Sequence, residues 1–188
     1  MRAKGSGEST LLLLDAMDTL HGLRIPYVVI GALAASFHGL VRGSQDADAL
    51  ISLSSQADVK ALRDTLQKAG LHSTYQRGDP EDPIAGTIHV EDRVGNRVDL
   101  LMGIRGVGEA VFARAVDATV MKTRIRVVGL EDFLAMKIFA GSPKDLADAS
   151  GVLHVSGDQV NQALLNELVQ PYGKSALRTL GSLMKSTK

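Results

Sequence analysis

The residues of this sequence that are best placed to do chemistry are aspartates. Asp46 and Asp48 occur two positions apart, where a short apolar run begins. Side chains on a strand alternate between two faces, so both carboxylates are expected on the same face. A divalent cation with carboxylate ligands would offset the cost of crowding two anions there. The alternative reading is a solvated strand face that carries no ligand.

A third aspartate, Asp99, lies in a second apolar stretch. Val98, Leu100 and Met102 alternate with it and are expected to face the core, which puts Asp99 on the opposite face. Three carboxylates on two strands would form a platform for two Mg²⁺ ions, as phosphoryl or nucleotidyl transfer requires. The alternative is an exposed carboxylate paired with Arg97 or with a lysine.

Three further residues near the aspartate pair could contact phosphate. Gly31 separates an apolar strand from a small-residue helix, and its missing Cβ would let backbone amides approach a phosphate group. Arg42 and Ser44 directly precede the aspartate pair. The plainer interpretation is that all three are turn residues.

Composition limits the function classes. The chain has 188 residues, with 21 Lys+Arg balanced by 21 Asp+Glu, so a strongly basic nucleic-acid binder is disfavoured, although a local basic patch is not. It has no cysteine, which excludes disulfides, zinc ribbons and thiol nucleophiles. The five histidines have no metal-ligand spacing, and His38, near the aspartates, is expected to be a packed or capping residue. No targeting or membrane-spanning segment is evident, so we expect a cytoplasmic protein without membrane contact.

The hydrophobic pattern predicts the elements that must position these residues. Helices are expected over residues 9–22, with Ser9 or Thr10 as cap, and over 31–38, 56–69, 106–115, 130–140, 143–154, 158–169 and 172–184. Strands are expected over residues 28–30, 46–53 and 71–75, in a hairpin of 87–91 with 97–102, and once or twice within 119–128. The fold class is therefore mixed α/β (α+β), with a sheet-containing core over residues 1–128 and a helical segment over 129–188 packed on it as one compact unit.

These motifs resemble a known family. Gly31-Ala32, a helix, Arg42-x-Ser44-x-Asp46-x-Asp48 and a later Asp99 are similar to the DNA-polymerase-beta-like nucleotidyltransferase superfamily. The stretch over residues 27–52 looks most like the small bacterial branch that contains AbiEii-type toxins. Lys137, followed by Lys144-Asp145-Leu146-Ala147-Asp148, is similar to a later motif of that branch. The resemblance covers residues 26–153.

The resemblance implies a nucleotidyltransferase-type mixed sheet flanked by helices, and a Mg²⁺-dependent enzyme, with two ions, that moves a nucleoside monophosphate from an NTP to a hydroxyl group. The residues that it marks as catalytic metal ligands are Asp46, Asp48 and Asp99, with Asp99 also as base, and those that it places toward the nucleotide are Gly31, Ala32, Arg42, Ser44, Lys137 and Asp145. The acceptor would be an RNA 3′ end, a protein or a small molecule. A toxin role with a cognate antitoxin is also implied, and the oligomeric state is left open.

Other readings of the same residues stay open. Ser142-Pro143-Lys144-Asp145 is also a favourable helix start, and Lys137 could pair with Asp145 or Asp148 and hold helices together. Ala32 replaces the family's second small residue, Gly or Ser. Ser44 stands for the commoner Thr, and Ser142 for an Arg. These departures favour an alternative, a catalytically weak or inactive member that binds a nucleotide or a partner. A third reading is a plain interaction domain with solvated carboxylates.

Overall fold

The protein is built around one mixed seven-stranded sheet. The computed structural model describes residues 1–186, and the strand order in the sheet is β3-β4-β5-β2-β1-β7-β6. The strands are β1 (Tyr27–Val29), β2 (Asp46–Ile51), β3 (His72–Arg77), β4 (Ile84–Glu91), β5 (Arg97–Ile104), β6 (Val116–Val120) and β7 (Thr123–Val127). Strands β2 and β5 run parallel to each other, as do β1 and β7, and all other neighbours are antiparallel.

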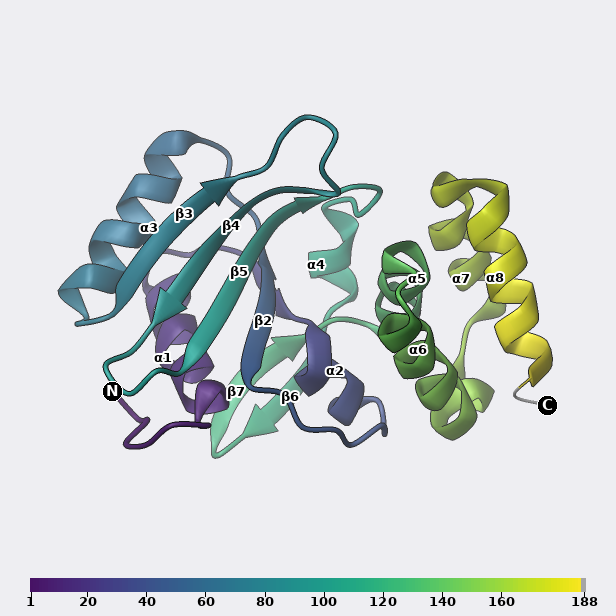
Figure 1. Ribbon diagram of the computed structural model, residues 1–188, viewed down its shortest axis with the longest axis horizontal. Helices are drawn as coiled ribbons and strands as arrows, with labels where there is room; N and C mark the ends of the chain where they lie inside the picture. Colours follow the sequence, from purple (N-terminus) through teal and green to yellow (C-terminus); the bar gives the residue numbers. More distant parts are fainter. Residues whose placement is uncertain (187–188) are drawn as a thin grey trace.

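Helices lie on both sides of this sheet (Figure 1). They are α1 (Ser9–Gly22), α2 (Gly31–Phe37), α3 (Gln56–Lys68), α4 (Ala110–Arg114), α5 (Leu130–Ala140), α6 (Pro143–Ser156), α7 (Gln162–Val169) and α8 (Gly173–Ser186), with short 3₁₀ turns at Gly157–Gln159 and Gln170–Tyr172. No helix among residues 1–186 is both long and apolar enough to cross a bilayer.

The core forms where α1 and α3 cover one face of the sheet. Helix α1 contacts β2 and β5, and α3 contacts α1 and β3. The α1 side chains Leu12, Leu13 and Met17 are completely buried, as are Val98 and Leu100 of β5. Burying each such side chain contributes roughly 1.5–3 kcal/mol. The alternation in β5 therefore commits its even-numbered residues 98 and 100 to the core and leaves Asp99 on the other face.

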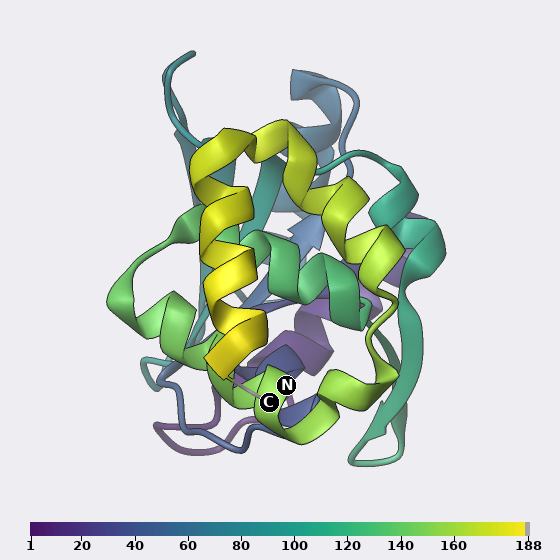
Figure 2. The same cartoon turned by 90° about the vertical axis from the view of Figure 1, so that its right-hand side faces the viewer.

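Helices α5–α8 gather at the opposite side of the molecule from α1 and α3 (Figures 1 and 2). Helix α5 is central among them and contacts α6, α7 and α8. Its residues Phe133 and Leu134 are almost completely buried. The helix stops at Gly141, which adopts a left-handed conformation that glycine reaches without strain.

The predicted fold class is confirmed, and so are most elements, with shifted ends. The strand expected over residues 71–75 is His72–Arg77, and the stretch 119–128 holds β7 and the end of β6, which begins earlier, at Val116. The helix expected over 106–115 is only Ala110–Arg114, because Gly106 has a positive φ and a loop precedes the helix. The helix expected from residue 158 begins at Gln162, after a 3₁₀ turn.

The start of α1 differs from expectation, because neither Ser9 nor Thr10 caps the helix. Ser9 is the first helical residue, and its hydroxyl donates a hydrogen bond to the carbonyl of Gln45 at 2.5 Å. The same oxygen accepts a hydrogen bond from the backbone N–H of Arg97 at 3.2 Å. Ser9 therefore joins the start of β2 to the start of β5.

The N-terminal segment is held in the same region by Asn96, which is 1% exposed. The Asn96 amide donates to the carbonyl of Gly5, and its side-chain oxygen accepts from the backbone N–H of Glu8. These hydrogen bonds fix the residues just ahead of α1 against the turn between β4 and β5.

Candidate active site

Two of the three predicted aspartates lie side by side on adjacent strands. In the parallel pairing of β2 with β5, Asp48 is the register partner of Asp99, and Asp46 is the partner of Arg97. Register partners project from the same face of a sheet, here the one opposite the core contacts of Val98 and Leu100. The structure thus places the aspartates on one face, as expected, although they are about fifty residues apart in the chain.

Asp48 lies where burial and neighbouring carboxylates oppose its ionisation. It is half-buried, and among residues 1–186 no side chain donates a hydrogen bond to its carboxylate. Burial raises the pKa of Asp48, and the nearby carboxylates of Asp99 and Asp46 raise it further, against the opposing charges of Lys137 and Arg42. Ionised Asp48 is therefore an anion without a close cationic partner, and such a group favours binding of a cation.

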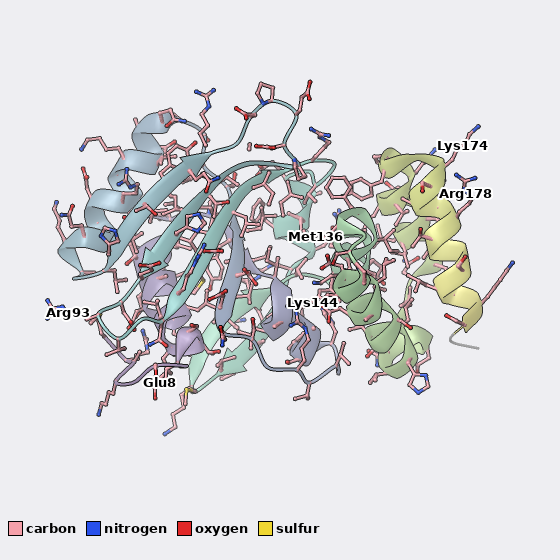
Figure 3. The ribbon with its side chains drawn as sticks, viewed as in Figure 1. Glu8, Arg93, Met136, Lys144, Lys174 and Arg178 are labelled. Atoms are coloured by element: carbon pink, nitrogen blue, oxygen red, sulfur yellow. The ribbon has the colours of Figure 1, made fainter. Side chains whose placement is uncertain are left out.

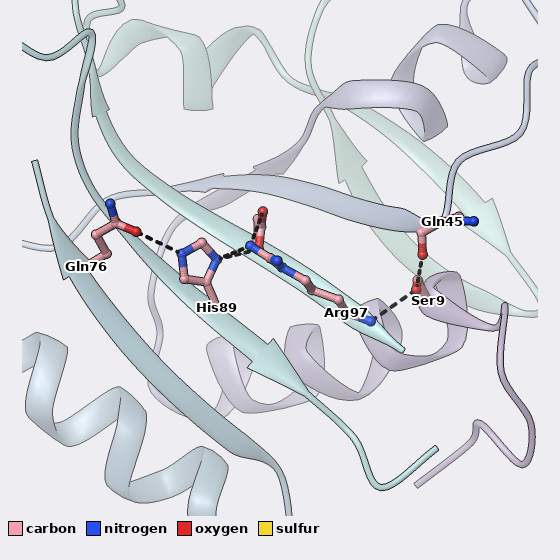
Figure 4. Close-up of polar contacts among 6 residues, drawn as sticks. Ser9, Gln45, Gln76, His89 and Arg97 are labelled. Carbon is pink, nitrogen blue, oxygen red and sulfur yellow. Dashed lines mark hydrogen bonds and ion pairs between the residues drawn. The ribbon is translucent and has the colours of Figure 1, made fainter. Parts of the chain in front are cut away.

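Asp99 has partners of its own. Its carboxylate accepts hydrogen bonds from Arg97 Nε at 2.9 Å and from Arg97 Nη2 at 3.3 Å, and His89 Nδ1 lies 2.7 Å from its Oδ1 (Figure 4). In the structure, Asp99 thus makes the ion pair with Arg97 that the sequence analysis gave as its alternative role. Within the described part of the chain, no three His, Cys, Asp or Glu side chains converge closely enough to hold a metal ion.

Gly31 begins α2 directly beside Asp48. Its φ of 65° lies in the left-handed region, and a Cβ built there would overlap the Oδ2 atom of Asp48. Glycine is therefore required twice, by backbone conformation and by the close approach of the carboxylate. The contact that the structure shows for Gly31 is with an aspartate, whereas its approach to a phosphate stays a prediction.

We expect Gly31→Ala to destabilise the fold by about 1–3 kcal/mol, from the left-handed backbone alone, and in addition to displace Asp48. Urea unfolding measures the first effect. The matched control is Gly70→Ala, since Gly70 has a φ of 82° but no neighbouring atom that a Cβ would meet. Equal losses of stability in the two variants would show that the overlap with Asp48 costs nothing.

A cleft of about 360 Å³ opens between the sheet and α5. Its polar lining residues are Asp48, Lys137 and Asp145, beside Gly31, and most of the remaining wall is apolar. Met136 points from α5 toward the sheet (Figure 3). Leu101 and Ile104 of β5 also line the cleft. The volume and the lining of the cleft suit a ligand that has a charged part and an apolar or aromatic part.

Lys137 is at the polar end of the cleft, where two carboxylates hold it. Its Nζ lies 2.7 Å from Asp145 Oδ1 and 2.9 Å from Asp148 Oδ2, and its side chain is 13% exposed. Although burial opposes the change, hydrogen bonds from Lys137 and Ser142 lower the pKa of Asp145. The Ser142 hydroxyl also accepts a hydrogen bond from the backbone N–H of Asp145 and so caps α6. Asp145 therefore lies in the first turn of this helix, as the alternative interpretation of the sequence predicts.

Comparison with known proteins identifies the fold. No family model and no curated protein sequence matches the chain. Among solved structures, an antigenic nucleotidyltransferase-like protein from Paracoccidioides brasiliensis superposes with a TM-score of 0.60 at 16% identity, covering 98% of this chain and 91% of that one. The antibiotic-resistance factor ANT(2″)-Ia, in complex with adenylyl-2″-tobramycin, gives 0.60 at 12% identity, over 88% and 99%. The lincosamide antibiotic adenylyltransferase LnuA, with lincomycin bound, gives 0.50 at 10% identity, over 80% and 98%.

The chain has a nucleotidyltransferase-like fold. At such low sequence identities, the structural likeness shows the architecture alone. The activity has to be argued from the residues of the site.

The other predicted residues of this nucleotidyltransferase-like fold line a separate small hollow. Ala32, Arg42, Ser44 and Asp46 border a space of about 80 Å³ together with Gly7, Ser9, Thr10, Leu33, Ser36 and Ala47. Arg42 is engaged there, because its Nε lies 2.9 Å from Asp148 Oδ1. Ser44 and Asp46 are exposed, and Ala32 is buried. The cleft and the hollow thus divide the predicted residues between them, and Asp99 lines neither.

Sequence reasoning did not single out His89, or the stacked pair Phe139 and Tyr172, whose ring centroids are 4.4 Å apart. A signal for His89 was available, since the predicted hairpin around residues 92–96 already places His89 opposite Asp99. No comparable signal existed for Phe139 and Tyr172, because their contact depends on how α5 packs against the chain leading into α8. His38 is a packed residue, as expected, with Nε2 2.8 Å from the carbonyl of Val128, and burial lowers its pKa.

Proposed function

We propose that this protein is a Mg²⁺-dependent nucleotidyltransferase that moves a nucleoside monophosphate from an NTP to a hydroxyl acceptor. The observation that carries the proposal is the parallel register of β2 and β5, which sets Asp48 beside Asp99 next to a cleft that contains Lys137. The nucleotidyltransferase-like fold supports it, because the fold neighbours ANT(2″)-Ia and LnuA are, by their descriptions, linked to adenylyl transfer to antibiotics.

The chemistry of the candidate ligands suits magnesium. All three candidate ligands, Asp46, Asp48 and Asp99, are carboxylates, the oxygen ligands that Mg²⁺ prefers, and no side chain within residues 1–186 donates a hydrogen bond to Asp48. Bound Mg²⁺ would stabilise negative charge on the phosphate oxygens and lower the pKa of the acceptor hydroxyl. Asp99 would have to turn away from Arg97 to join the set.

The residues of the chain then take defined roles. In the transfer, the acceptor oxygen forms a bond to the α-phosphorus, the bond to pyrophosphate breaks, and the acceptor proton passes to Asp99 or to solvent. Lys137 would balance negative charge on the triphosphate once its ion pairs with Asp145 and Asp148 break. The nucleotide base would pack against the apolar wall near Met136 and Phe139. Ser44 and Arg42 lie on the approach to β2, where Arg42 would contact phosphate only after leaving Asp148.

The test is label transfer. The protein is incubated with Mg²⁺ and each α-labelled NTP, together with total RNA, extract protein or small hydroxyl compounds in separate reactions. We expect one acceptor class to become labelled by wild-type protein and by Asp64→Asn, a control on the exposed face of α3. Unchanged labelling by Asp46→Asn would refute the metal assignment.

A second candidate is a member that binds a nucleotide without transferring it. The observation that favours it is that Lys137 and Arg42 are both occupied by carboxylates, while the three aspartates do not converge. Calorimetric binding of Mg²⁺ with an NTP, without labelling of any acceptor, would support this candidate over the first.

The finer assignment within the proposal rests on sequence motifs alone. Membership of the AbiEii-type branch, and with it a toxin role that a cognate antitoxin would restrain, follows from the resemblance of residues 26–153. Growth arrest on induced expression that is absent with Asp48→Asn would support it, and continued growth in both cases would count against it.

A further inference from the structure

In a polar cluster on β4 and β5, one nitrogen of His89 lies within hydrogen-bonding distance of both an acceptor and a donor. His89 Nδ1 lies 2.7 Å from Asp99 Oδ1 and 2.7 Å from Arg97 Nη2, while His89 Nε2 lies 3.5 Å from the side-chain oxygen of Gln76 (Figure 4). Arg97 also reaches Asp99 directly through Nε at 2.9 Å. The side chains of His89 and Asp99 are about one-fifth exposed, and that of Arg97 is two-fifths exposed.

One nitrogen cannot satisfy both neighbours of His89 at once. Each ring nitrogen of a neutral imidazole is either an N–H donor or a lone-pair acceptor. Asp99 can only accept from Nδ1, whereas the guanidinium of Arg97 can only donate to it. The positions of the three side chains therefore suit two alternative arrangements, in which His89 serves either Asp99 or Arg97.

We propose that His89 is a positioning residue that takes over Arg97 when Asp99 turns to the cation of the proposed function. In the first arrangement, Nδ1–H and Arg97 both donate to Asp99. In the second, Nδ1 accepts from Arg97 and Nε2–H donates to Gln76. The inference rests on the proposed function, since it gives Asp99 a reason to leave.

The exchange explains how Asp99 is released at low cost. Arg97 keeps its charge throughout and would otherwise lose its partner when Asp99 moves, and leaving a partly buried charged group unpaired is unfavourable. With His89 in place, Arg97 exchanges one acceptor for another within the same cluster. The proton count of the ring is unchanged, since one proton leaves Nδ1 and one joins Nε2.

The experiment measures binding of Mn²⁺ alone, by the loss of the free-ion signal in electron paramagnetic resonance. We expect His89→Ala to weaken Mn²⁺ binding about tenfold, at the lower end of the effect of removing a residue that supports a metal ligand. His89→Asn should stay within about threefold of wild type, because its amide oxygen can accept from Arg97. His72→Ala, an exposed histidine on β3, is the matched control.

A second background separates positioning from a merely structural role. In Arg97→Met no guanidinium needs an acceptor, so adding His89→Ala should leave Mn²⁺ affinity unchanged. An equal loss in both backgrounds would overturn the exchange with Arg97. Equal affinity of His89→Ala and wild type would overturn the inference while leaving the proposed function intact, whereas wild-type protein that binds no Mn²⁺ would overturn both.

A measurement on wild-type protein covers the case in which a variant fails to fold. With ¹⁵N-labelled histidine, addition of Mg²⁺ should move the proton of the His89 ring from Nδ1 to Nε2, which the nitrogen shifts report directly. Unchanged shifts at saturating Mg²⁺ would overturn the exchange.

Discussion

Asp48→Asn is expected to abolish nucleotidyl transfer and, at the same time, to make the protein more stable. Loss of a metal-binding carboxylate should cost about 10³-fold in rate, which corresponds to about 4 kcal/mol of transition-state stabilisation. Stability should rise because the substitution removes a half-buried charge whose ionisation is opposed by burial and by the carboxylates of Asp99 and Asp46. A gain of about 1 kcal/mol would raise the melting temperature by about 2–4 °C.

The size of this gain in stability depends on pH. Because the pKa of Asp48 is raised in the folded state, ionising it costs stability as the pH rises through that pKa. The advantage of Asp48→Asn should therefore be largest at neutral pH and shrink in acid, where Asp48 is protonated. Thermal melts of both proteins without metal, from pH 4 to pH 8, measure it. A lower melting temperature for the variant at neutral pH would contradict the picture of an uncompensated anion.

Lys137→Met is expected to reduce both transfer and stability. Asp148 is 4% exposed, and loss of the ammonium group leaves Arg42 as its one cationic partner within residues 1–186. Breaking a buried ion pair by removing one partner costs about 3–5 kcal/mol, and the remaining arginine should reduce this to about 2 kcal/mol. We expect transfer to fall about 10²-fold, because one charged contact to the triphosphate is lost. Urea unfolding and label transfer measure the two effects.

The double variant Lys137→Met with Asp148→Asn separates these effects. It removes the buried charge of Asp148 along with Lys137, although Arg42 then loses its partner, so stability should recover in part while transfer stays low. Recovery of transfer together with stability would mean that Lys137 only holds α5 to α6 and never touches the nucleotide.

The local elements of this fold could be predicted from the sequence because their signals are local. Helix α5 begins and ends where expected, since Gly141 fixes its end. The hairpin of β4 and β5 follows from the turn residues between them. The side on which Asp99 lies follows from the alternation of Val98 and Leu100 in β5.

Sheet order and ion pairing could not be predicted in the same way. The insertion of β2 between β1 and β5, which brings Asp48 to Asp99, depends on contacts between segments far apart in the chain, including those of α1 with β2 and β5. The sequence predicts that Arg42 is a turn residue or contacts phosphate. Its ion pair with Asp148 cannot be predicted from neighbouring residues, because Asp148 lies more than a hundred positions away in the chain. The sequence allows Lys137 either to pair with Asp145 and Asp148 or to face a ligand. The packing of α6 against α5 brings the two carboxylates to Lys137.

The hydrogen bonds of Ser9 and Asn96 have a practical consequence for handling the protein. Ser9, the first residue of α1, joins the starts of the two strands that carry the aspartates, and Gly5 and Glu8 just ahead of α1 are held by Asn96. These residues therefore belong to the framework of the site. Trimming the first nine residues would leave the amide of Asn96 buried without the partners it has in Gly5 and Glu8. Affinity tags and surface attachments for assays are therefore better placed beyond α8 than fused closely to the N-terminal segment.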